Sequence, residues 1–352
     1  MIVIGIDPHK QTHTAVAVDG STGELLGELT VPARQAGHER LLGWARALAA
    51  ERRFALEDCR HVSGSLERVL LARGETVVRV PPKLMAGARR SARERGKSDA
   101  IDAAAVARAA LREPGLPLAR VEGPTREIRL LLDHREDLVG ERTRIQQRLR
   151  WHLHDLDPEL EIPGGALDRR VWLERLGRRL GRLEQSVQVR ICRELVARCR
   201  ELARRASELE RELALLVEQQ APALLALPGC GALTAAKLLA ETGGVERFDS
   251  DAKLALHAGA APLDASSGRQ QRHRLNRSGN RQLNCALHRI AITQGRTHPP
   301  ARAYLERKQA EGKSRREALR CLKRHLARTV YNTLKTTITT TPSTAPHEPC
   351  LT

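Results

Sequence analysis

Four acidic residues near the start of the chain have the types and positions that phosphodiester chemistry requires. Asp7 ends the apolar run "IVIGID", and Glu57 ends the run "FALE". Asp99 and Asp102 lie three residues apart in "RGKSDAIDAAAVARAAL", a spacing that places both carboxylates on one face of a helix. Four carboxylates that meet are enough to hold two divalent ions for phosphoryl transfer. We therefore identify these four acids as candidate catalytic and metal-binding residues, with Mg²⁺ or Mn²⁺ as the expected cofactor.

Each acid also has an ordinary structural explanation. Carboxylates near a helix N-terminus are stabilised by capping and by the helix dipole, at roughly 0.3–1 kcal/mol each. Asp58 directly follows Glu57, so either residue could be the acid that faces a site. The order of a strand ending in Asp, a strand ending in Glu and a helix with Asp-x-x-Asp is more specific than any single acid. That order favours a metal site.

The elements around these acids predict a mixed α/β sheet. Residues 2–7, 12–19 and 23–31 are β-rich runs separated by "PHKQ" and "GST", as in a meander of hairpins. Strands expected at 54–57 and 76–80 then alternate with helices expected at about 36–50 and 63–73, before the Ala-rich helix. We expect residues 1–123 to form the catalytic domain.

The charge of the chain indicates a polyanionic partner. Its 352 residues carry a formal net charge of +18, with a pI near 10.5. Nine of the 60 basic residues are lysine, and a GC-rich genome explains that ratio but not the excess of bases over 42 acids. No apolar run approaches about 18 residues, so nucleic acid is favoured over membrane as the partner.

The cysteines and the N-terminus favour a cytoplasmic, nucleoid-associated protein. Seven cysteines are scattered without any C-x-x-C pair, a pattern typical of reduced thiols and not of disulfides or zinc. The chain begins with "MIVIGID", a strand pattern that no basic stretch precedes, so we expect no secretory signal.

Two long helices predict an antiparallel coiled-coil arm or dimerisation hairpin over residues 124–220. Apolar residues recur at 3-4 spacing in each helix, and the segment "DPELEIPGGALD" joins the two. Arginines and a histidine occupy other core positions of the first helix. The predicted seam consists of Ile128, Leu131, Leu138, Ile145, Leu149 and Leu156, then Leu195, Cys199, Leu202, Ala206, Leu209, Leu213 and Leu216.

A further domain is predicted over residues 221–335. Its clearest feature is "PALLALPGCGALTAAKLLAETGG", a Gly-x-Gly turn between two short apolar helices, as in a helix-hairpin-helix element. Backbone amides near Gly229 and Gly231 would then bind phosphates, although the same glycines fit an ordinary turn. The Thr- and Pro-rich residues 336–352 are expected to be disordered.

Several stretches resemble the DEDD transposases of insertion-sequence family 110 over nearly the whole chain. They are "GIDPHK", "LEDCRH", "VVRVPPKLMAGARRS", "GKSDAIDA", "LPGCG" and "GAAPLDASSGRQQRHRLNRSGNRQLN". The resemblance implies a RuvC-like domain with an RNase H fold, a helical arm and a mainly helical C-terminal transposase domain. Asp7, Glu57, Asp99 and Asp102 match the acidic tetrad of that family.

The resemblance also implies a serine nucleophile. Ser267 precedes a glycine in "DASSGR" as the family pattern has it, and Ser266 is its rival. Family members act as oligomers on two DNA segments and are guided by a structured RNA, so DNA and a guide RNA are the expected partners. The implied nucleic-acid contacts are Lys97, Arg269, Arg272, Arg274, Asn280 and Arg281; His9 and Lys10 also recur in the pattern.

One position departs from the family pattern. The run "RSGNRQLN" ends in Leu283-Asn284, where the family usually ends in Leu-Arg. One expected basic contact is therefore absent, and Asn280 fits a helix-capping turn as well as a phosphate contact.

The sequence thus predicts a DNA transposase or site-specific recombinase with a metal-bound tetrad and a transient serine–phosphate linkage. Because the acids and Ser267 fall in different predicted domains, we expect a composite active site. A RuvC-like or RNase H-like nuclease that uses water would explain the tetrad but not "SSGR". A non-catalytic nucleic-acid-binding protein would explain the charge but not four intact acids.

Overall fold

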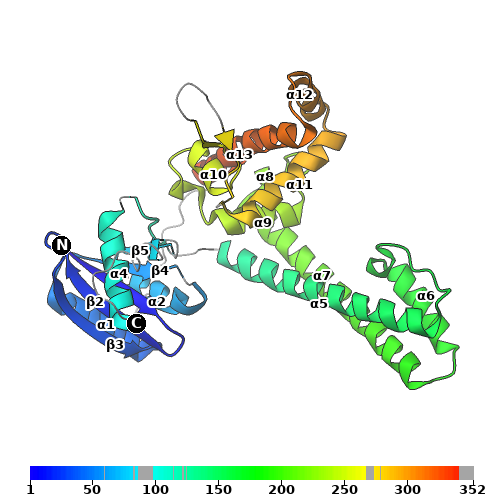
Figure 1. Cartoon of the computed structure of the whole chain (residues 1–352), viewed down its shortest axis with the longest axis horizontal. Coiled ribbons are helices and arrows are strands. Elements are labelled where there is room, and N and C mark those ends of the chain that lie inside the picture. The colour runs from blue at the N-terminus through cyan, green and yellow to red at the C-terminus, as the bar shows by residue number, and fades with distance from the viewer. Residues whose placement is uncertain are drawn as a thin grey trace, which may run out of the picture. The chain divides into compact units, whose positions relative to one another are not determined.

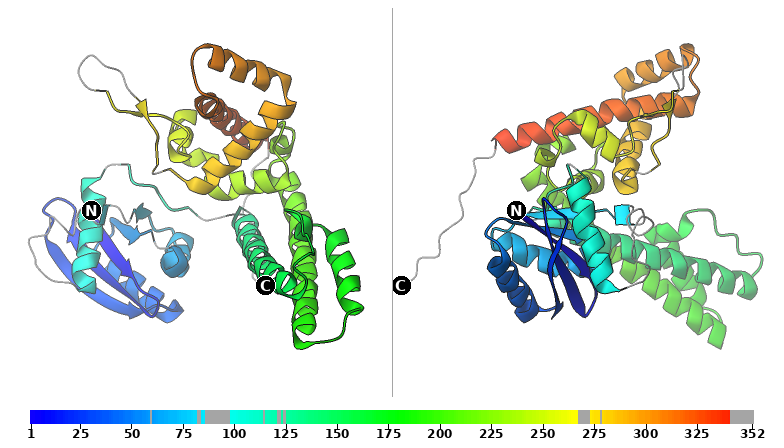
Figure 2. Two further views of the ribbon diagram at one scale, coloured as in Figure 1. Left: turned by 45° about the vertical axis from the view of Figure 1, so that its right-hand side comes forward. Right: turned by 60° about the vertical axis from the view of Figure 1, so that its left-hand side comes forward.

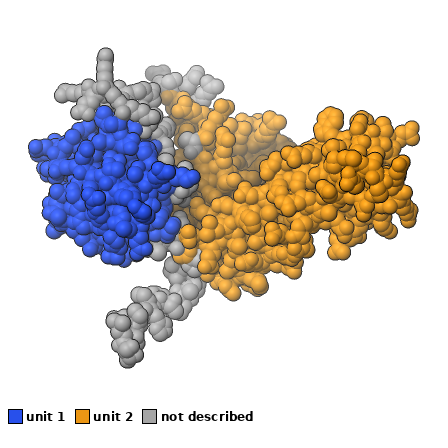
Figure 3. All heavy atoms as spheres, turned by 90° about the horizontal axis from the view of Figure 1, so that it is seen from below, with its two compact units in different colours: residues 1–122 blue, residues 123–352 orange. Residues whose placement is uncertain are grey.

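The computed structural model describes residues 1–58, 60–81, 84–85, 98–113, 115–120, 123, 125–266, 273–277 and 279–340. Within it the chain forms two compact units, residues 1–122 and 123–352 (Figure 3). The predicted arm and the predicted C-terminal domain both belong to the second unit. Each unit has its own hydrophobic cores.

The first unit is built on one mixed sheet, which confirms the predicted α/β class. Its strands are β1 (Ile2–Pro8), β2 (Thr12–Asp19), β3 (Leu25–Pro32), β4 (Arg52–Glu57) and β5 (Val77–Val80), in the order β3-β2-β1-β4-β5. β1, β2 and β3 form an antiparallel meander, whereas β4 and β5 run parallel to β1. The first strand is therefore central and has neighbours of both orientations.

Helices cover both faces of this sheet (Figure 2). They are α1 (Gln35–Leu48), α2 (Arg60–Ala72) and α4 (Asp99–Arg112). Because strand side chains alternate between faces, Ile2, Ile4 and Ile6 of β1 pack with α1 and α2. Val3 of β1 and Ala55 of β4 lie on the opposite face, against α4. The buried face of α4 consists mostly of alanines.

Gly5 sets how closely α4 approaches the sheet. It lies on the α4 face of β1, and a Cβ atom at this position would overlap the carbonyl oxygen of Ala103 and lie 2.8 Å from Cβ of Ala107. The backbones of strand and helix therefore pack with no side chain between them. Only small residues on both sides permit this distance.

The second unit is helical apart from a two-stranded ribbon. Two long helices, α5 and α7, lie side by side with α6 at their far end (Figure 1). The elements are α5 (Thr125–Leu156), η1 (Ala166–Asp168), α6 (Arg170–Gly181), α7 (Val187–Gln220), α8 (Pro222–Leu225), α9 (Ala232–Thr242), η2 (Val245–Arg247), α10 (Asp251–His257), β6 (Leu263–Asp264), β7 (His273–Arg274), α11 (Arg281–Thr297), α12 (Pro299–Ala310) and α13 (Arg315–Thr340).

The two long helices are antiparallel and pack against each other within one chain. Arg135 contacts Glu210 near one end of the pair, and Gln188 contacts His152 and Asp155 near the other. Leu131, Leu195, Leu209 and Leu216 of the predicted seam are only half-buried, and α6 also packs on α7. Val189, Cys192 and Val196 are buried there instead. The helix α6 was not expected from the sequence.

The near ends of the long helices belong to the C-terminal core. Ile128 and Leu132 of α5 and Leu213 and Val217 of α7 are buried with residues of α9, α11 and α13. This shared core explains why the arm and the C-terminal helices form one compact unit.

The C-terminal helix extends further than expected. Residues 336–340, expected to be disordered, continue α13 to Thr340. Buried Val330, Tyr331 and Leu334 anchor the preceding turns, and tertiary packing of this kind overrides the weak helix propensity of threonine. Among the described helices, none combines the length and apolar character needed to cross a membrane.

We predict that Gly5→Ala destabilises the first unit by about 3 kcal/mol, the upper end of the range for overpacking, because backbone atoms of α4 cannot rotate away. Native-state hydrogen exchange of the β1 amides measures this change within the unit itself. Gly43→Ala is the matched control, since Gly43 lies on the exposed face of α1 with nothing within 4 Å of the added Cβ. It should stabilise by about 0.5–1 kcal/mol. Equal protection factors in both variants would contradict the close approach.

Candidate active site

Asp7 and Glu57 lie side by side at the ends of two parallel strands. Ile6 of β1 is in register with Leu56 of β4, so the next residues, Asp7 and Glu57, are neighbours across the pair. Asp7 follows Val3 and Gly5 on the α4 face by the two-residue period of a strand. Glu57 follows Ala55 on that same face. The sheet thus directs both carboxylates toward α4.

Glu57 is the last residue of β4, and Asp58 follows the strand. The charge of Glu57 raises the pKa of Asp7. Glu57 therefore belongs to the acidic group around Asp7, and the choice between Glu57 and Asp58 as the catalytic acid stays a prediction.

The remaining two acids are in the first turn of α4. Ser98 caps this helix, and its hydroxyl accepts a hydrogen bond of 3.2 Å from the backbone N–H of Ile101. Asp102 is buried and Asp99 is exposed. Because α4 packs directly on Gly5, its first turn reaches the end of β1, and the charges of both acids act on Asp7.

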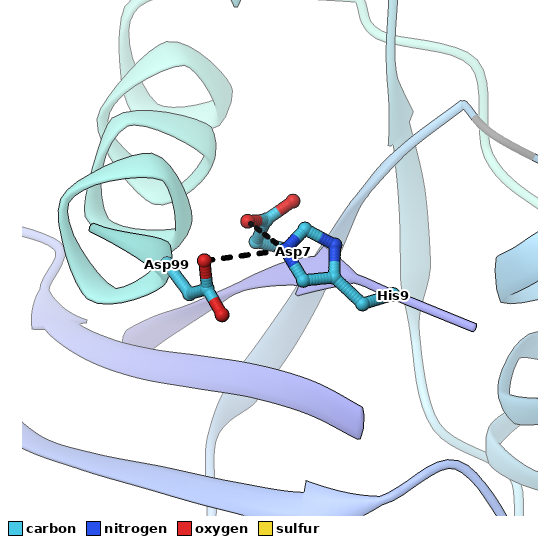
Figure 4. A group of neighbouring side chains, drawn as sticks. All are labelled: Asp7, His9 and Asp99. Atoms are coloured by element: carbon cyan, nitrogen blue, oxygen red, sulfur yellow. Dashed lines mark ion pairs between the residues drawn. The ribbon is translucent and has the colours of Figure 1, made fainter. Parts of the chain in front are cut away.

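His9 lies between two of the acids (Figure 4). Its Nε2 is 3.6 Å from Oδ2 of Asp7 and 3.2 Å from Oδ1 of Asp99. The hydrogen bond to Asp99 raises the pKa of His9, and the charges of Asp7 and Asp99 raise it further, against the opposing effect of burial. His9 was not among the predicted site residues, although its recurrence in the family pattern was a signal for it.

Asp7 is a buried ionisable group whose pKa is raised by its surroundings. Burial raises its pKa; the charge of His9 lowers it, and the charges of Asp102, Glu57 and Asp99 raise it again. Its Oδ2 is buried and has no hydrogen-bond partner within the described residues. A buried carboxylate oxygen among three other carboxylates is the environment that a bound divalent cation would stabilise.

The donor set fits a hard divalent cation. Ligand atoms of Asp7, His9 and Asp99 all lie within 4.8 Å of one another. Carboxylate oxygens are the ligands that Mg²⁺ and Mn²⁺ prefer, and Glu57 and Asp102 offer more of them close by. Lys97 lies outside the described residues.

A two-stranded ribbon in the second unit flanks the loop that carries the predicted serine. β6 and β7 pair through Leu263 with Arg274 and Asp264 with His273. The loop between them contains Ser267, Arg269 and Arg272, which lie outside the described residues. Arg274 is exposed on β7.

Ser266 is held by a local turn at the base of this loop. Its backbone N–H donates to Oδ1 of Asp264 at 2.9 Å, and its hydroxyl donates to the same oxygen. This Asx-turn gives Ser266 a structural role.

The other end of the loop is fixed by a backbone crossing. A Cβ atom on Gly279 would lie 3.0 Å from the carbonyl carbon of Ala258 and closer still to the backbone of Gly259. Asn284, at the position that departs from the family pattern, donates at 2.8 Å to the carbonyl oxygen of Ala258 and accepts at 2.7 Å from Nζ of Lys323. Asn284 therefore links the end of α10 to α13, at a position where the family pattern has a basic residue.

Asn280 and Arg281 begin α11. Oδ1 of Asn280 accepts a hydrogen bond of 2.9 Å from the N–H of Leu283, and its amide group donates to Glu241 at 2.5 Å. Asn280 is thus a helix cap, the alternative that the sequence left open. Arg281 is exposed.

The two glycines of "LPGCG" have different structural roles. Gly229 has a φ of +79°, and an added Cβ would meet Thr293 of α11 at 3.0 Å, so this turn packs on α11. Gly231 is exposed at the start of α9 with nothing within 4 Å of its Cβ position. Of the two, only Gly231 presents an open backbone surface.

Comparison with solved structures gives a weak match. "T. thermophilus RuvC in complex with Holliday junction substrate" aligns with a TM-score of 0.26 and 18% sequence identity. The match covers 32% of this chain and 93% of that one. A score of this size does not establish a common fold.

Comparison with protein families and curated sequences is decisive. Residues 4–158 match the DEDD transposase family of IS110 elements, and residues 221–306 match the "Transposase IS116/IS110/IS902 family". The chain is 30% identical to an uncharacterized 44.8 kDa protein of insertion element IS116 from Streptomyces clavuligerus, over 92% of each sequence. It is 26% identical to an uncharacterized 42 kDa protein of IS900 from Mycobacterium paratuberculosis, over 91% of this chain and 92% of that one. The chain therefore belongs to the IS110 family of insertion-element transposases.

Proposed function

We propose that this transposase cuts and rejoins DNA with a divalent-metal site on the first unit and a serine nucleophile on the second. The observation that carries the proposal is the convergence of Glu57, Asp99 and Asp102 on Asp7, whose Oδ2 is buried without a hydrogen bond in the described part of the chain. A cluster of like charges around a buried carboxylate costs stability, so its presence favours a role in chemistry.

The first unit is proposed to be an RNase H-like domain of the RuvC type. Three features support this proposal. The strand order is β3-β2-β1-β4-β5, β2 runs antiparallel to its neighbours β1 and β3, and acids lie at the ends of β1 and β4. The pair α5 and α7 is proposed to act as a coiled-coil arm, and α8 and α9 as a helix-hairpin-helix element that contacts phosphate near Gly231.

In the proposed reaction, the hydroxyl oxygen of Ser267 attacks a phosphorus atom of DNA. The Ser267 proton passes to a carboxylate of the tetrad, the new serine–phosphate bond forms, and one ester oxygen leaves and takes up a proton. A divalent metal, when bound, neutralises the charge that develops on the phosphate. Reversal with an incoming strand hydroxyl restores Ser267 and joins the new DNA ends.

The residues of this chain have separate tasks in that step. Asp7, Glu57, Asp99 and Asp102 hold the metal, and His9 balances the charge of Asp7 and Asp99. The exposed guanidinium of Arg274 lies at the base of the serine loop, where it is able to contact DNA phosphate. Because the acids and the serine belong to different units, the reaction requires DNA that both units contact.

A structured guide RNA stays a prediction from the family resemblance. The excess of basic residues is compatible with it, since RNA and DNA both present phosphates. Sequencing the nucleic acid that co-purifies with the chain is the direct check.

We predict that Asp7→Asn, Glu57→Gln, Asp99→Asn and Asp102→Asn each reduce strand cleavage by at least about 100-fold, the scale for loss of one charge-stabilising group. DNA binding should stay near the wild-type level, because the surface charge is otherwise unchanged. Asp58→Asn is the control and should cleave normally. Loss of activity in Asp58→Asn with retention in Glu57→Gln would shift the site by one residue.

We also predict how a divalent cation changes the thermal midpoint of the wild type and of Asp7→Asn. Millimolar Mg²⁺ or Mn²⁺ should raise the thermal midpoint of the wild type but not of Asp7→Asn. Because the folded-state pKa of Asp7 is raised above 3.8, ionised Asp7 lowers stability at neutral pH, and this cost vanishes below pH 3.8. In EDTA at pH 7, Asp7→Asn should therefore melt above the wild type.

The serine prediction separates the recombinase from a nuclease that uses water. Ser267→Ala should abolish the covalent protein–DNA adduct while metal and DNA binding persist, and Ser266→Ala should form the adduct. Denaturing electrophoresis after incubation with substrate DNA detects the linkage. If Ser267→Ala recombines DNA at the wild-type rate, water is the nucleophile and the serine mechanism is wrong.

We also propose a homo-oligomer through the arm. Because the apolar seam is covered within each chain, the interface must use residues that remain exposed, of which Trp151 on α5 is 74% exposed. Trp151→Glu should lower the mass measured by light scattering to that of a monomer. Leu118→Glu, at an exposed leucine of the first unit, is the control; an unchanged mass for both variants would exclude this face of the arm.

A further inference from the structure

A chain of hollows follows one face of α7. The first hollow is lined by residues of α6 and α7. The second is lined by residues of the same two helices and by Arg142 of α5 and Asp168. The third is lined by residues of α7, by Gly231 and by the first turn of α9. Neighbouring hollows share Ala197 and Arg200, then Ser207 and Arg211, so they form one continuous groove. We name this feature the arm groove; its α7 wall consists of Arg193, Val196, Ala197, Arg200, Glu201, Ala203, Arg204, Ser207, Glu210, Arg211 and Ala214.

The wall has a regular helical pattern. Its arginines, Arg193, Arg200, Arg204 and Arg211, recur at steps of seven and four, which keeps them on one face of α7. From Arg193 to Arg211 the groove extends about 27 Å at 1.5 Å per residue. Over that length one strand of a DNA duplex presents about eight phosphates.

The lining of the groove carries more positive than negative charge, with seven arginines and four acids. Each acid in its lining is already held by an arginine: Asp168 by Arg142, Glu174 by Arg170, Glu201 by Arg204 and Glu210 by Arg135. Four lining arginines form no ion pair with an acid in the described part of the chain. They are Arg178, Arg193, Arg200 and Arg211.

The lining chemistry selects among nucleic acids. Single strands are held by aromatic side chains on which bases stack, and no aromatic residue is among those that line the groove in the described structure. Small floor residues such as Ala197 and Ser207 leave room for a backbone between the guanidinium groups. Arginine forks bind phosphate oxygens without reading sequence.

We infer that the arm groove binds the phosphate backbone of duplex DNA independently of sequence. The inference rests on the proposed function only in taking DNA as the partner. The groove ends beside Gly231 and Thr234 at the start of α9, so backbone that follows α7 arrives at the proposed helix-hairpin-helix element. The arm groove thus supplies affinity that the acidic site does not, because the carboxylates of that site repel phosphate.

The test compares two double variants that remove the same charge. Arg200→Ala/Arg211→Ala alters the groove, and Arg144→Ala/Arg148→Ala removes two exposed arginines of α5 that do not line it. Binding of a 30-base-pair duplex in EDTA is followed by fluorescence anisotropy across a salt series. Each lost phosphate contact lowers the slope of log affinity against log salt by about 0.9. We expect a decrease of about 1.8 for the groove variant and no change for the control.

Further measurements separate the possible outcomes of this test. Ser207→Glu adds a negative charge to the groove wall and should weaken duplex binding in the same direction, with thermal melting as the check that each variant is folded. Equal slopes for both double variants overturn the inference, and so does loss of duplex RNA binding with DNA binding intact. A wild-type chain that binds no DNA would contradict the proposed function itself. A cleavage-deficient chain with an intact groove effect would contradict only the mechanism.

Discussion

The direct contact between α4 and Gly5 brings Asp99 and Asp102 to the two acids that the sheet carries. Asp7 and Glu57 are fixed by the sheet, but Asp99 and Asp102 reach them only because the helix lies against bare backbone of β1. The alanines of α4 serve this contact, since a larger residue at Ala103 or Ala107 would lift the helix from the strand. The Ala-rich sequence of α4 is thus needed for the four acids to meet.

Local rules predicted the part of the fold that depends on neighbouring residues. Alternation of apolar residues indicated the strands of the meander, and the acids at strand ends followed from where each strand stops. The approach of Glu57 to Asp7 depends on the register of β1 with β4, which pairs residues some 50 positions apart. His9 was missed for the same reason, because its role depends on Asp99, a residue brought near only by tertiary packing.

The arm shows a different limit of periodicity. A 3-4 pattern identifies which residues are buried along a helix, but not whether the partner is another chain or another segment of the same chain. Here α6 packs on α7, and the buried face shifts to include Val189, Cys192 and Val196. Because α5 and α7 also enter the C-terminal core through Ile128 and Val217, the arm and the C-terminal helices share one core.

The distribution of charge separates affinity for DNA from chemistry on it. Asp7, Glu57, Asp99 and Asp102 repel a phosphate backbone until a cation neutralises them, so this site contributes little to binding on its own. Arginines of the proposed arm groove would attract the same backbone and need no metal to do so. Under the proposed mechanism, such a chain would hold DNA whenever salt permits but would cleave only where the metal and Ser267 meet on a bound strand. Binding and cleavage then respond to different conditions, salt for the one and divalent cation for the other.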